Sequence, residues 1–129
     1  MKMNYKLVAA TLLGAVAGAA GISALRAQAP KPAAGFVVAE VEVTDPATFK
    51  EYGDKAPGTI KQYGGRYIIR GGKSESVEGD APKRFIVIQF DNVEKAKAWE
   101  DSPEYGAIKP IRHKSAKSRV FIIEGAPQM

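Results

Sequence analysis

The segment Arg84-Phe85-Ile86-Val87-Ile88-Gln89-Phe90 has the strongest preference for a β-strand in this chain of 129 residues. Most of its residues are β-branched or aromatic, types that fit the pleated, half-buried surface of a sheet. Three further segments, 36–43, 66–70 and 119–124, have the composition and alternation of strands. The chain is therefore predicted to form a sheet of four strands.

A first helix is expected between the strands 36–43 and 66–70. Thr44 or Asp45 provides its cap, Pro46 stands in its first turn, and Gly64-Gly65 ends it. Apolar residues recur there at helical spacing, namely Phe49, Tyr52, Ala56, Ile60 and Tyr63. Pro57-Gly58 is expected to kink or split the helix at its middle, because proline lacks the backbone N–H.

A second helical region is expected between the last two strands. Asn92 can cap a helix that includes Val93, Ala96 and Trp99. Ser102-Pro103 then restarts it as a further stretch to about Ala116, with an interruption near Pro110.

The resulting order β-α-β-β-α-β predicts the α+β class and the ferredoxin-like arrangement, with helices on one face of a four-stranded antiparallel sheet. The other face is left open. Alternation places Val37, Ala39, Val41, Val43, Tyr67, Ile69, Ile86, Ile88 and Phe90 under the helices. It places Val38, Glu40, Glu42, Arg66, Ile68, Arg70, Phe85, Val87 and Gln89 on the open face. The orientation of residues 119–124 is not determined by the pattern.

The open face is too apolar to be left in water, because valine, isoleucine and phenylalanine alternate there with charged residues. Two such sheets that pack face to face across a two-fold axis would cover it. We therefore expect a homodimer in which the two sheets form an α/β barrel.

Residues 1–29 have the features of a signal peptide. Lys2 and Lys6 precede an uncharged run over 7–25, and small residues allow cleavage after Ala27 or Ala29. The alternative is an uncleaved segment that anchors the protein in a membrane. A flexible lead-in is expected over 30–35 and one domain over 36–126, placed in the periplasm or outside the cell.

The charge balance argues against nucleic acid as a partner. The whole chain has a net charge of +5, but three of its 19 basic residues and none of its 14 acidic residues lie in 1–29. The remainder, with sixteen basic residues against 14 acidic ones, has a net charge of only +2. Binding to nucleic acid needs a concentrated basic patch.

Several motifs occur in one order along the domain: Val41-Glu42-Val43-Thr44-Asp45-Pro46, Tyr63-Gly64-Gly65-Arg66-Tyr67 with Arg70-Gly71-Gly72, Glu78-Gly79-Asp80, Ala98-Trp99 with Asp101-Ser102-Pro103-Glu104-Tyr105, Pro110-Ile111-Arg112 and Ile123-Glu124-Gly125. Over about residues 36–126 the chain resembles the domain-of-unknown-function 1330 family of small bacterial proteins. This resemblance implies membership of the dimeric α/β-barrel superfamily, which includes cofactor-free monooxygenases, lactone isomerases and haem-binding enzymes. It implies no established activity or catalytic residues. Glu100 departs from the aromatic residue expected there and would make a pocket at that position more polar.

Polar side chains expected on the open face form the candidate ligand site, namely Glu40, Glu42, Arg66, Arg70 and Gln89. The arginines would bind an organic anion, and a glutamate would act as a general base. Alternatively, the glutamates and arginines pair with each other. Trp99 and Tyr105 would line the mouth of a pocket, or else pack in the core.

No metal or cofactor is expected. His113 is the single histidine and the chain has no cysteine, so a zinc site would depend on Glu40 and Glu42. As a haem ligand only His113 is available, and in its basic context a solvated helix position is favoured.

Two functions stay open: a homodimer that binds a small molecule or a partner protein, and a cofactor-independent enzyme of the monooxygenase or isomerase type. The enzyme would need an enclosed titratable group, with Glu40 or Glu42 as the candidate.

Overall fold

The computed structural model describes residues 31–128, and the predicted signal peptide lies outside this range. The elements of the described part are β1 (Gly35–Val43), α2 (Pro46–Gln62), β2 (Arg66–Arg70), β3 (Arg84–Phe90), α3 (Val93–Glu100), α4 (Pro103–Ser115) and β4 (Ala116–Glu124). Among these residues no helix has the length and apolar character needed to cross a membrane.

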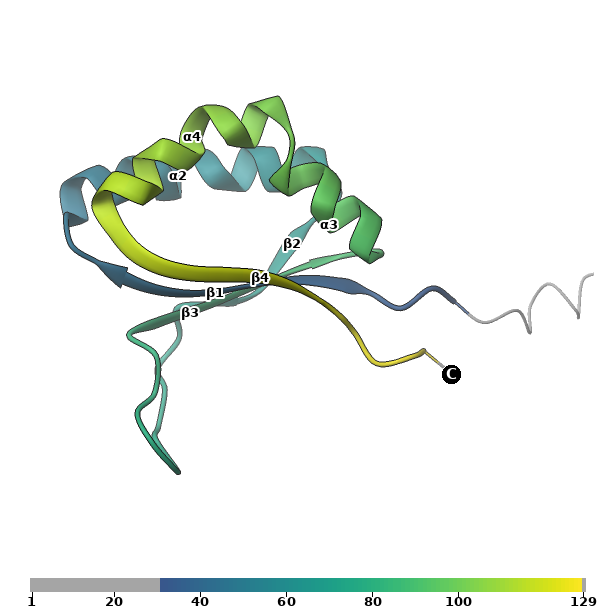
Figure 1. Cartoon of the computed structure of the whole chain (residues 1–129), viewed down its shortest axis with the longest axis horizontal. Helices are drawn as coiled ribbons and strands as arrows, with labels where there is room; N and C mark the ends of the chain where they lie inside the picture. The colour runs from purple at the N-terminus through teal and green to yellow at the C-terminus, as the bar shows by residue number, and fades with distance from the viewer. Residues whose placement is uncertain (1–30, 129) are drawn as a thin grey trace, which may run out of the picture. The chain divides into compact units, whose positions relative to one another are not determined.

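The four strands form one antiparallel sheet in the order β2-β3-β1-β4. The three helices of the described residues cover the same face of this sheet, and none of them lies on the opposite face (Figure 1). The predicted α+β, ferredoxin-like fold is therefore confirmed. β4 begins three residues earlier than expected, at Ala116, because residues 116–118 continue the pairing with the end of β1.

Each helix begins at a side-chain cap that the sequence indicated. Asp45 accepts a hydrogen bond from the backbone N–H of Thr48 at the start of α2. Asn92 does the same at α3, and Ser102 at α4. These caps satisfy backbone donors that have no partner within the helix.

Pro57-Gly58 was expected to kink or split the first helix, and the split is wrong, because α2 runs unbroken from Pro46 to Gln62. α4 likewise passes through Pro110 without interruption. A proline within a helix leaves the carbonyl four residues earlier without its donor. For Pro57 this is the carbonyl of Gly53, and Arg70 of β2 donates a hydrogen bond to it at 3.1 Å. A tertiary contact thus replaces the missing bond.

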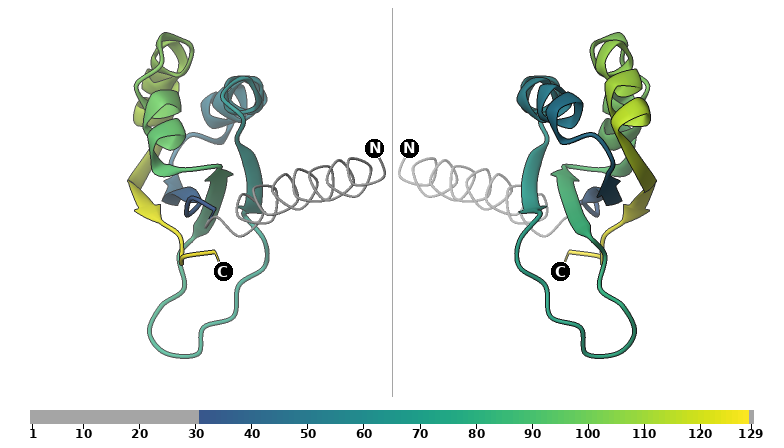
Figure 2. Two further views of the ribbon diagram at one scale, coloured as in Figure 1. Left: turned by 90° about the vertical axis from the view of Figure 1, so that its right-hand side faces the viewer. Right: turned by 90° about the vertical axis from the view of Figure 1, so that its left-hand side faces the viewer.

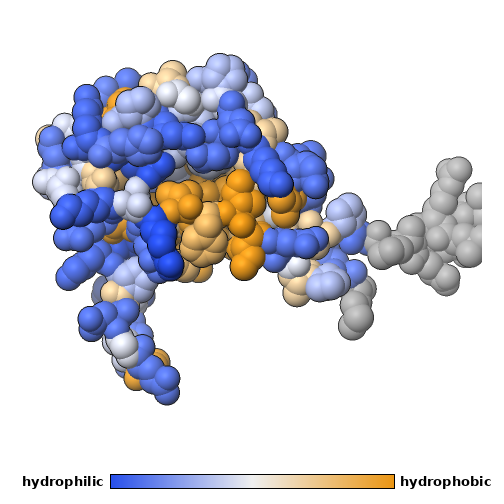
Figure 3. Space-filling model, viewed as in Figure 1, coloured by the Kyte–Doolittle hydropathy of each residue, from blue (hydrophilic) through white to orange (hydrophobic). Residues whose placement is uncertain are grey.

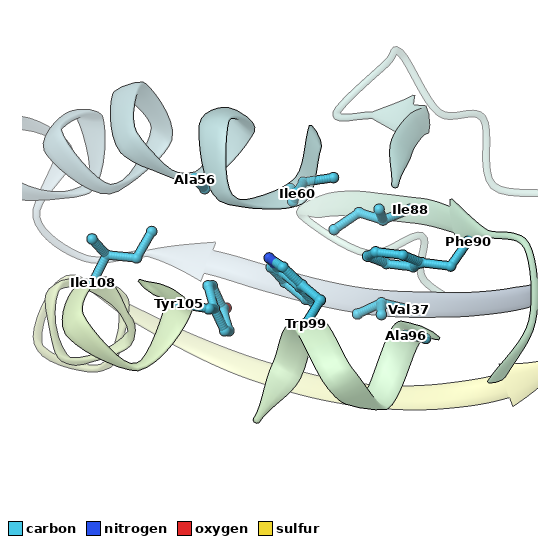
Figure 4. Close-up of a cluster of buried hydrophobic side chains, with 9 residues drawn as sticks. All are labelled: Val37, Ala56, Ile60, Ile88, Phe90, Ala96, Trp99, Tyr105 and Ile108. Carbon is cyan, nitrogen blue, oxygen red and sulfur yellow. The ribbon is translucent and has the colours of Figure 1, made fainter. Parts of the chain in front are cut away.

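The core lies between the sheet and the helices. Its larger cluster is shown in Figure 4 and consists of Val37, Ala56, Ile60, Ile88, Phe90, Ala96, Trp99, Tyr105 and Ile108. The Trp99 ring lies 3.9 Å from that of Tyr105 and 5.8 Å from that of Phe90, measured between centroids. Its indole N–H donates to Thr59 Oγ1 of α2 at 3.0 Å. Trp99 therefore joins all three helices to the sheet.

The register between β2 and β3 contains a β-bulge that changes which side chains lie under the helices. Tyr67 is opposite Ile88, but Ile69 is opposite Val87, so Ile68 is an extra residue. One extra residue reverses the facing of every position after it. The expected orientation of Ile69 and Arg70 is therefore wrong: Ile69 shares the open face with Val87, and Arg70 shares the helix face with Ile86.

Alanine at Gly35 is expected to destabilise the domain by about 1–3 kcal/mol, the usual cost of overpacking a well-packed site. A Cβ atom there would clash with the backbone oxygen of Asn92, so the start of α3 would have to move. Gly72→Ala is the matched control, because a Cβ atom at Gly72 meets nothing within 4 Å. Urea denaturation of both variants checks the prediction, which is contradicted by equal stabilities.

Candidate functional site

The open face of the sheet carries an apolar row flanked by polar side chains. Ile69, Val87, Val38 and Phe121 lie opposite one another across the four strands. Hydrophobic side chains also gather on the surface around β4 (Figure 3), where Phe121 and Ile123 are 39% and 51% exposed. The open face of the sheet lies on the side toward which the segment 71–83, between β2 and β3, projects (Figure 1).

The candidate ligand residues are Glu40, Glu42, Arg66, Arg70, Gln89 and Trp99. Four of these six lie on the open face, but in separate pairs. Arg66 Nη2 donates to Gln89 Oε1 at 3.2 Å. Glu40 Oε2 accepts from Arg119 Nε at 3.0 Å, and Glu42 lies opposite Lys117 in the register. A groove of about 480 Å³ separates Glu40 and Glu42 from Asp80 and Lys83 of the long loop. The glutamates are thus neighbours of β4 cations and not of Arg66.

The other two predicted residues, Arg70 and Trp99, lie on the helix side of the sheet. Arg70 reaches α2, and Trp99 is 1% exposed in the core. The structure does not bring the six residues together in one place. It offers instead a cavity between sheet and helices.

This inner cavity has a volume of about 30 Å³, room for about one water molecule. Its polar walls are Tyr52 of α2, Tyr67 of β2, and Tyr105 and Arg112 of α4, with Trp99 beside them. Aliphatic side chains of β1, β3 and β4 form the floor. The hydroxyl oxygens of Tyr52 and Tyr105 are 2.8 Å apart and share a hydrogen bond. Figure 2 shows α2 and α4 side by side above the sheet, the arrangement that encloses this space.

Arg112 is an unusual residue for such a place, because it is charged and only 5% exposed. Its Nη1 donates to Ser118 Oγ, but its Nε has no hydrogen-bond partner. None of the ion pairs between residues 31–128 includes it. A buried cation is costly unless an anion or several hydrogen bonds compensate it. The guanidinium is therefore suited to a negatively charged ligand.

The tyrosine hydroxyls are suited to donate hydrogen bonds. Burial raises the pKa of Tyr52 far above its ordinary value, and the Tyr105 hydroxyl adds to this shift. Burial also raises the pKa of Tyr67, against the effect of Arg70. Burial alone would lower the pKa of Arg112, but the oxygens of Tyr105 and Tyr52 raise it above the ordinary value. The cavity thus presents neutral hydroxyls and a permanent cation.

An outer cleft of about 260 Å³ adjoins the inner cavity, and Tyr52, Tyr67 and Ile86 line both. The cleft lies between α2 and the ends of β2 and β3. Its other walls are Phe49, Gly53, Arg70, Gly71 and Arg84. The outer cleft adjoins the inner cavity, whose wall includes Arg112.

Arg112 is not among the side chains that the sequence pattern predicted for a site. The signal for it is its spacing from Tyr105 and Ile108, both buried on the same helix. Arg112 follows them by seven and four residues, spacings that share one helix face, so an arginine in that row is buried. Glu100, at the position where an aromatic residue was expected, lines neither cavity and pairs with Lys109 at 2.6 Å. Within the described part of the chain, no three potential metal ligands lie together.

Comparison with known proteins supports the fold. The family model described as Domain of unknown function (DUF1330) matches residues 34–126. A protein of unknown function from Rhodopseudomonas palustris is similar in structure, with a TM-score of 0.61 and 13% sequence identity; the match covers 81% of this chain and 91% of that one. SnoaB, a cofactor-independent oxygenase from Streptomyces nogalater, gives a TM-score of 0.52 and 12% identity over 75% of this chain and 96% of that one. No curated protein matches the chain.

Proposed function

The chain belongs to the DUF1330 family, and from the cavity within its fold we propose that it is an exported homodimer that binds a small organic anion at Arg112. The observation that carries this proposal is the buried guanidinium with a free Nε at the wall of a cavity. A carboxylate that accepts hydrogen bonds from Arg112 and from a tyrosine hydroxyl would compensate the buried charge.

The dimensions of the two spaces define how the ligand lies. The inner cavity admits about one oxygen-sized group, such as one oxygen of a carboxylate, and the outer cleft is several times larger. The anionic end would occupy the inner cavity, and the body would lie against the rings of Phe49, Tyr52 and Tyr67. Entry from the cleft requires the shared tyrosine rings to turn aside.

Fluorescence titration with benzoate tests this proposal, because Trp99 is the single tryptophan and lines the inner cavity. We expect a saturable change in Trp99 emission with benzoate and none with the neutral methyl benzoate. A ligand retained during purification would also appear as added mass in native mass spectrometry. Equal responses to the acid and the ester contradict a site for anions.

The second candidate function is a cofactor-independent enzyme of the monooxygenase or isomerase type. The hydrogen-bonded pair of Tyr52 and Tyr105 beside Arg112 favours it, because such donors stabilise negative charge that develops on oxygen. The fold is shared with SnoaB, a cofactor-independent oxygenase. Turnover of a bound carbonyl compound distinguishes an enzyme from a binding module.

Homodimerisation through the open face is supported by the apolar row and by the charges beside it. An interface of two identical surfaces must be self-complementary. This face carries both signs, with Glu40 and Glu42 on β1 and Lys117 and Arg119 on β4. The segment 71–83 projects past the face and would lie along a second copy (Figure 1).

Aspartate at Phe121 is expected to convert the dimer into a folded monomer. The side chain is 39% exposed in the single chain, so the substitution costs the monomer little, but a dimer would have to bury the new carboxylate. Ala107→Asp on the exposed side of α4 is the control and should remain dimeric. Light scattering on the mature protein gives the mass. A wild-type protein that is monomeric at micromolar concentration contradicts the proposal.

Export is proposed from the signal-like residues 1–29. Expression of the full chain and fractionation of the cells would give the protein in the periplasm or medium, shortened after Ala27 or Ala29. A full-length protein in the membrane fraction identifies the alternative, a retained anchor.

A further inference from the structure

Two arginines stand at the outer cleft, on the same side of the sheet as the inner cavity. Arg84 is opposite Val41, and Arg70 is opposite Ile86, which places both on the helix face. Both line the outer cleft and both are exposed. The bulge in β2 is what brings Arg70 here, because an unbroken register would have placed it on the open face.

Each guanidinium is held over an aromatic ring of the cleft. The Arg70 guanidinium carbon lies 4.4 Å from the centroid of Tyr67, and that of Arg84 lies 5.2 Å from the centroid of Phe49. Arg70 is also fixed by its bond to the carbonyl of Gly53. Stacking of this kind orients the guanidinium and leaves its edge N–H groups available.

Neither arginine has an acidic partner among the residues that the structure describes. The ion pairs found within 31–128 include neither Arg70 nor Arg84, and the lining of the cleft contains no aspartate or glutamate. The cleft is therefore a cationic opening with aromatic walls. It leads to a third, buried cation at Arg112.

Resting on the proposed binding of an anion at Arg112, we propose that the ligand is a dianion with a flat body, whose second acidic group binds Arg70 and Arg84. A monoanion would use only the inner cation and leave the two outer ones hydrated. A flat, unsaturated or aromatic body suits the space, because Phe49, Tyr52 and Tyr67 provide ring faces on its walls. The chemical class is that of an aromatic or conjugated dicarboxylate.

Calorimetric titration with three probes tests the proposal: benzoate with one carboxylate, and terephthalate and 1,4-phenylenediacetate with two at different separations. At least one dicarboxylate is expected to bind about tenfold more tightly than benzoate, the gain of an additional charge-assisted contact at an exposed rim. Arg84→Met and Arg70→Met should each lower the ratio of dicarboxylate affinity to benzoate affinity from about ten toward one. Arg84→Lys should keep part of the gain.

Lys61→Met is the matched control, because it removes the same charge from an exposed position of α2 outside the cleft. Arg84→Met is the cleaner of the two cleft variants, since Arg70 also supports α2 through Gly53. Circular dichroism verifies that each variant is folded.

Three results overturn the inference: dicarboxylates that bind no more tightly than benzoate, cleft variants that weaken benzoate and dicarboxylates equally, or a control that has the same effect as the cleft variants. Failure of the proposed function looks different. In that case benzoate does not bind, or its binding does not depend on Arg112, whatever the outer arginines do.

Discussion

Methionine at Arg112 is expected to weaken the binding of benzoate at least about 30-fold while the domain stays folded. Loss of one partner of a buried, hydrogen-bonded charge pair costs about 2 kcal/mol or more in binding, which corresponds to that factor. Methionine has a similar length and no charge. Since the buried guanidinium has an unpartnered Nε and no ion pair within 31–128, its removal should leave the free energy of unfolding unchanged or raise it.

A loss of binding without a loss of stability makes the experiment decisive. A merely structural arginine would destabilise the protein when it is removed, and a ligand-binding one would not. Lys114→Met is the control, because Lys114 is exposed on the same helix and carries the same charge. Calorimetry and urea denaturation give the two quantities. Binding of benzoate that is unchanged in Arg112→Met contradicts the site.

Alanine at Trp99 is expected to lower the free energy of unfolding by about 3–5 kcal/mol, the usual cost of deleting a large buried aromatic side chain. The indole is 1% exposed, packs against Phe90 and Tyr105, and donates to Thr59. Its loss would leave an empty volume where three helices meet the sheet. For a domain of this size the midpoint of thermal unfolding should fall by more than about 12 °C.

Trp99→Phe is the companion variant and should cost less than half as much, because it keeps a stacked ring and loses the hydrogen bond to Thr59. Circular dichroism follows both transitions, since the variants lack the fluorescent residue. A pocket-mouth tryptophan would be nearly neutral to stability. A loss below about 1 kcal/mol in Trp99→Ala would therefore contradict the core position.

The unbroken course of α2 shows why the sequence pattern wrongly predicted a split at Pro57. Proline in a helix is disruptive mainly through the carbonyl that it leaves without a donor. Here that carbonyl, on Gly53, accepts from Arg70, which belongs to another element and lies 17 residues away in sequence. The helix continues because the fold provides the missing partner, and no local pattern contains that information.

The candidate site was predictable only in part. The open-face positions of Glu40, Glu42, Arg66 and Gln89 follow from strand alternation, and the register agrees with them. The partners of the glutamates could not be predicted, because Arg119 and Lys117 belong to β4, whose orientation the sequence pattern left undetermined. Tyr52 and Tyr67 were expected to face the core, and Tyr105 either there or at the mouth of a pocket. The space between these side chains depends on how they pack.

The sequence by itself determined the order of elements, the caps of the helices and the side chains that β1 and β3 place in the core. These features depend on periodicity and on neighbours within a few residues. Only the tertiary structure decided where Arg112 and Arg70 lie. Arg112 is buried because α4 packs on α2 and the sheet, and Arg70 faces the cleft because β2 inserts one extra residue opposite β3. The reason is that register and packing are properties of pairs of elements, so a shift of one residue reverses a face without any change in local preference.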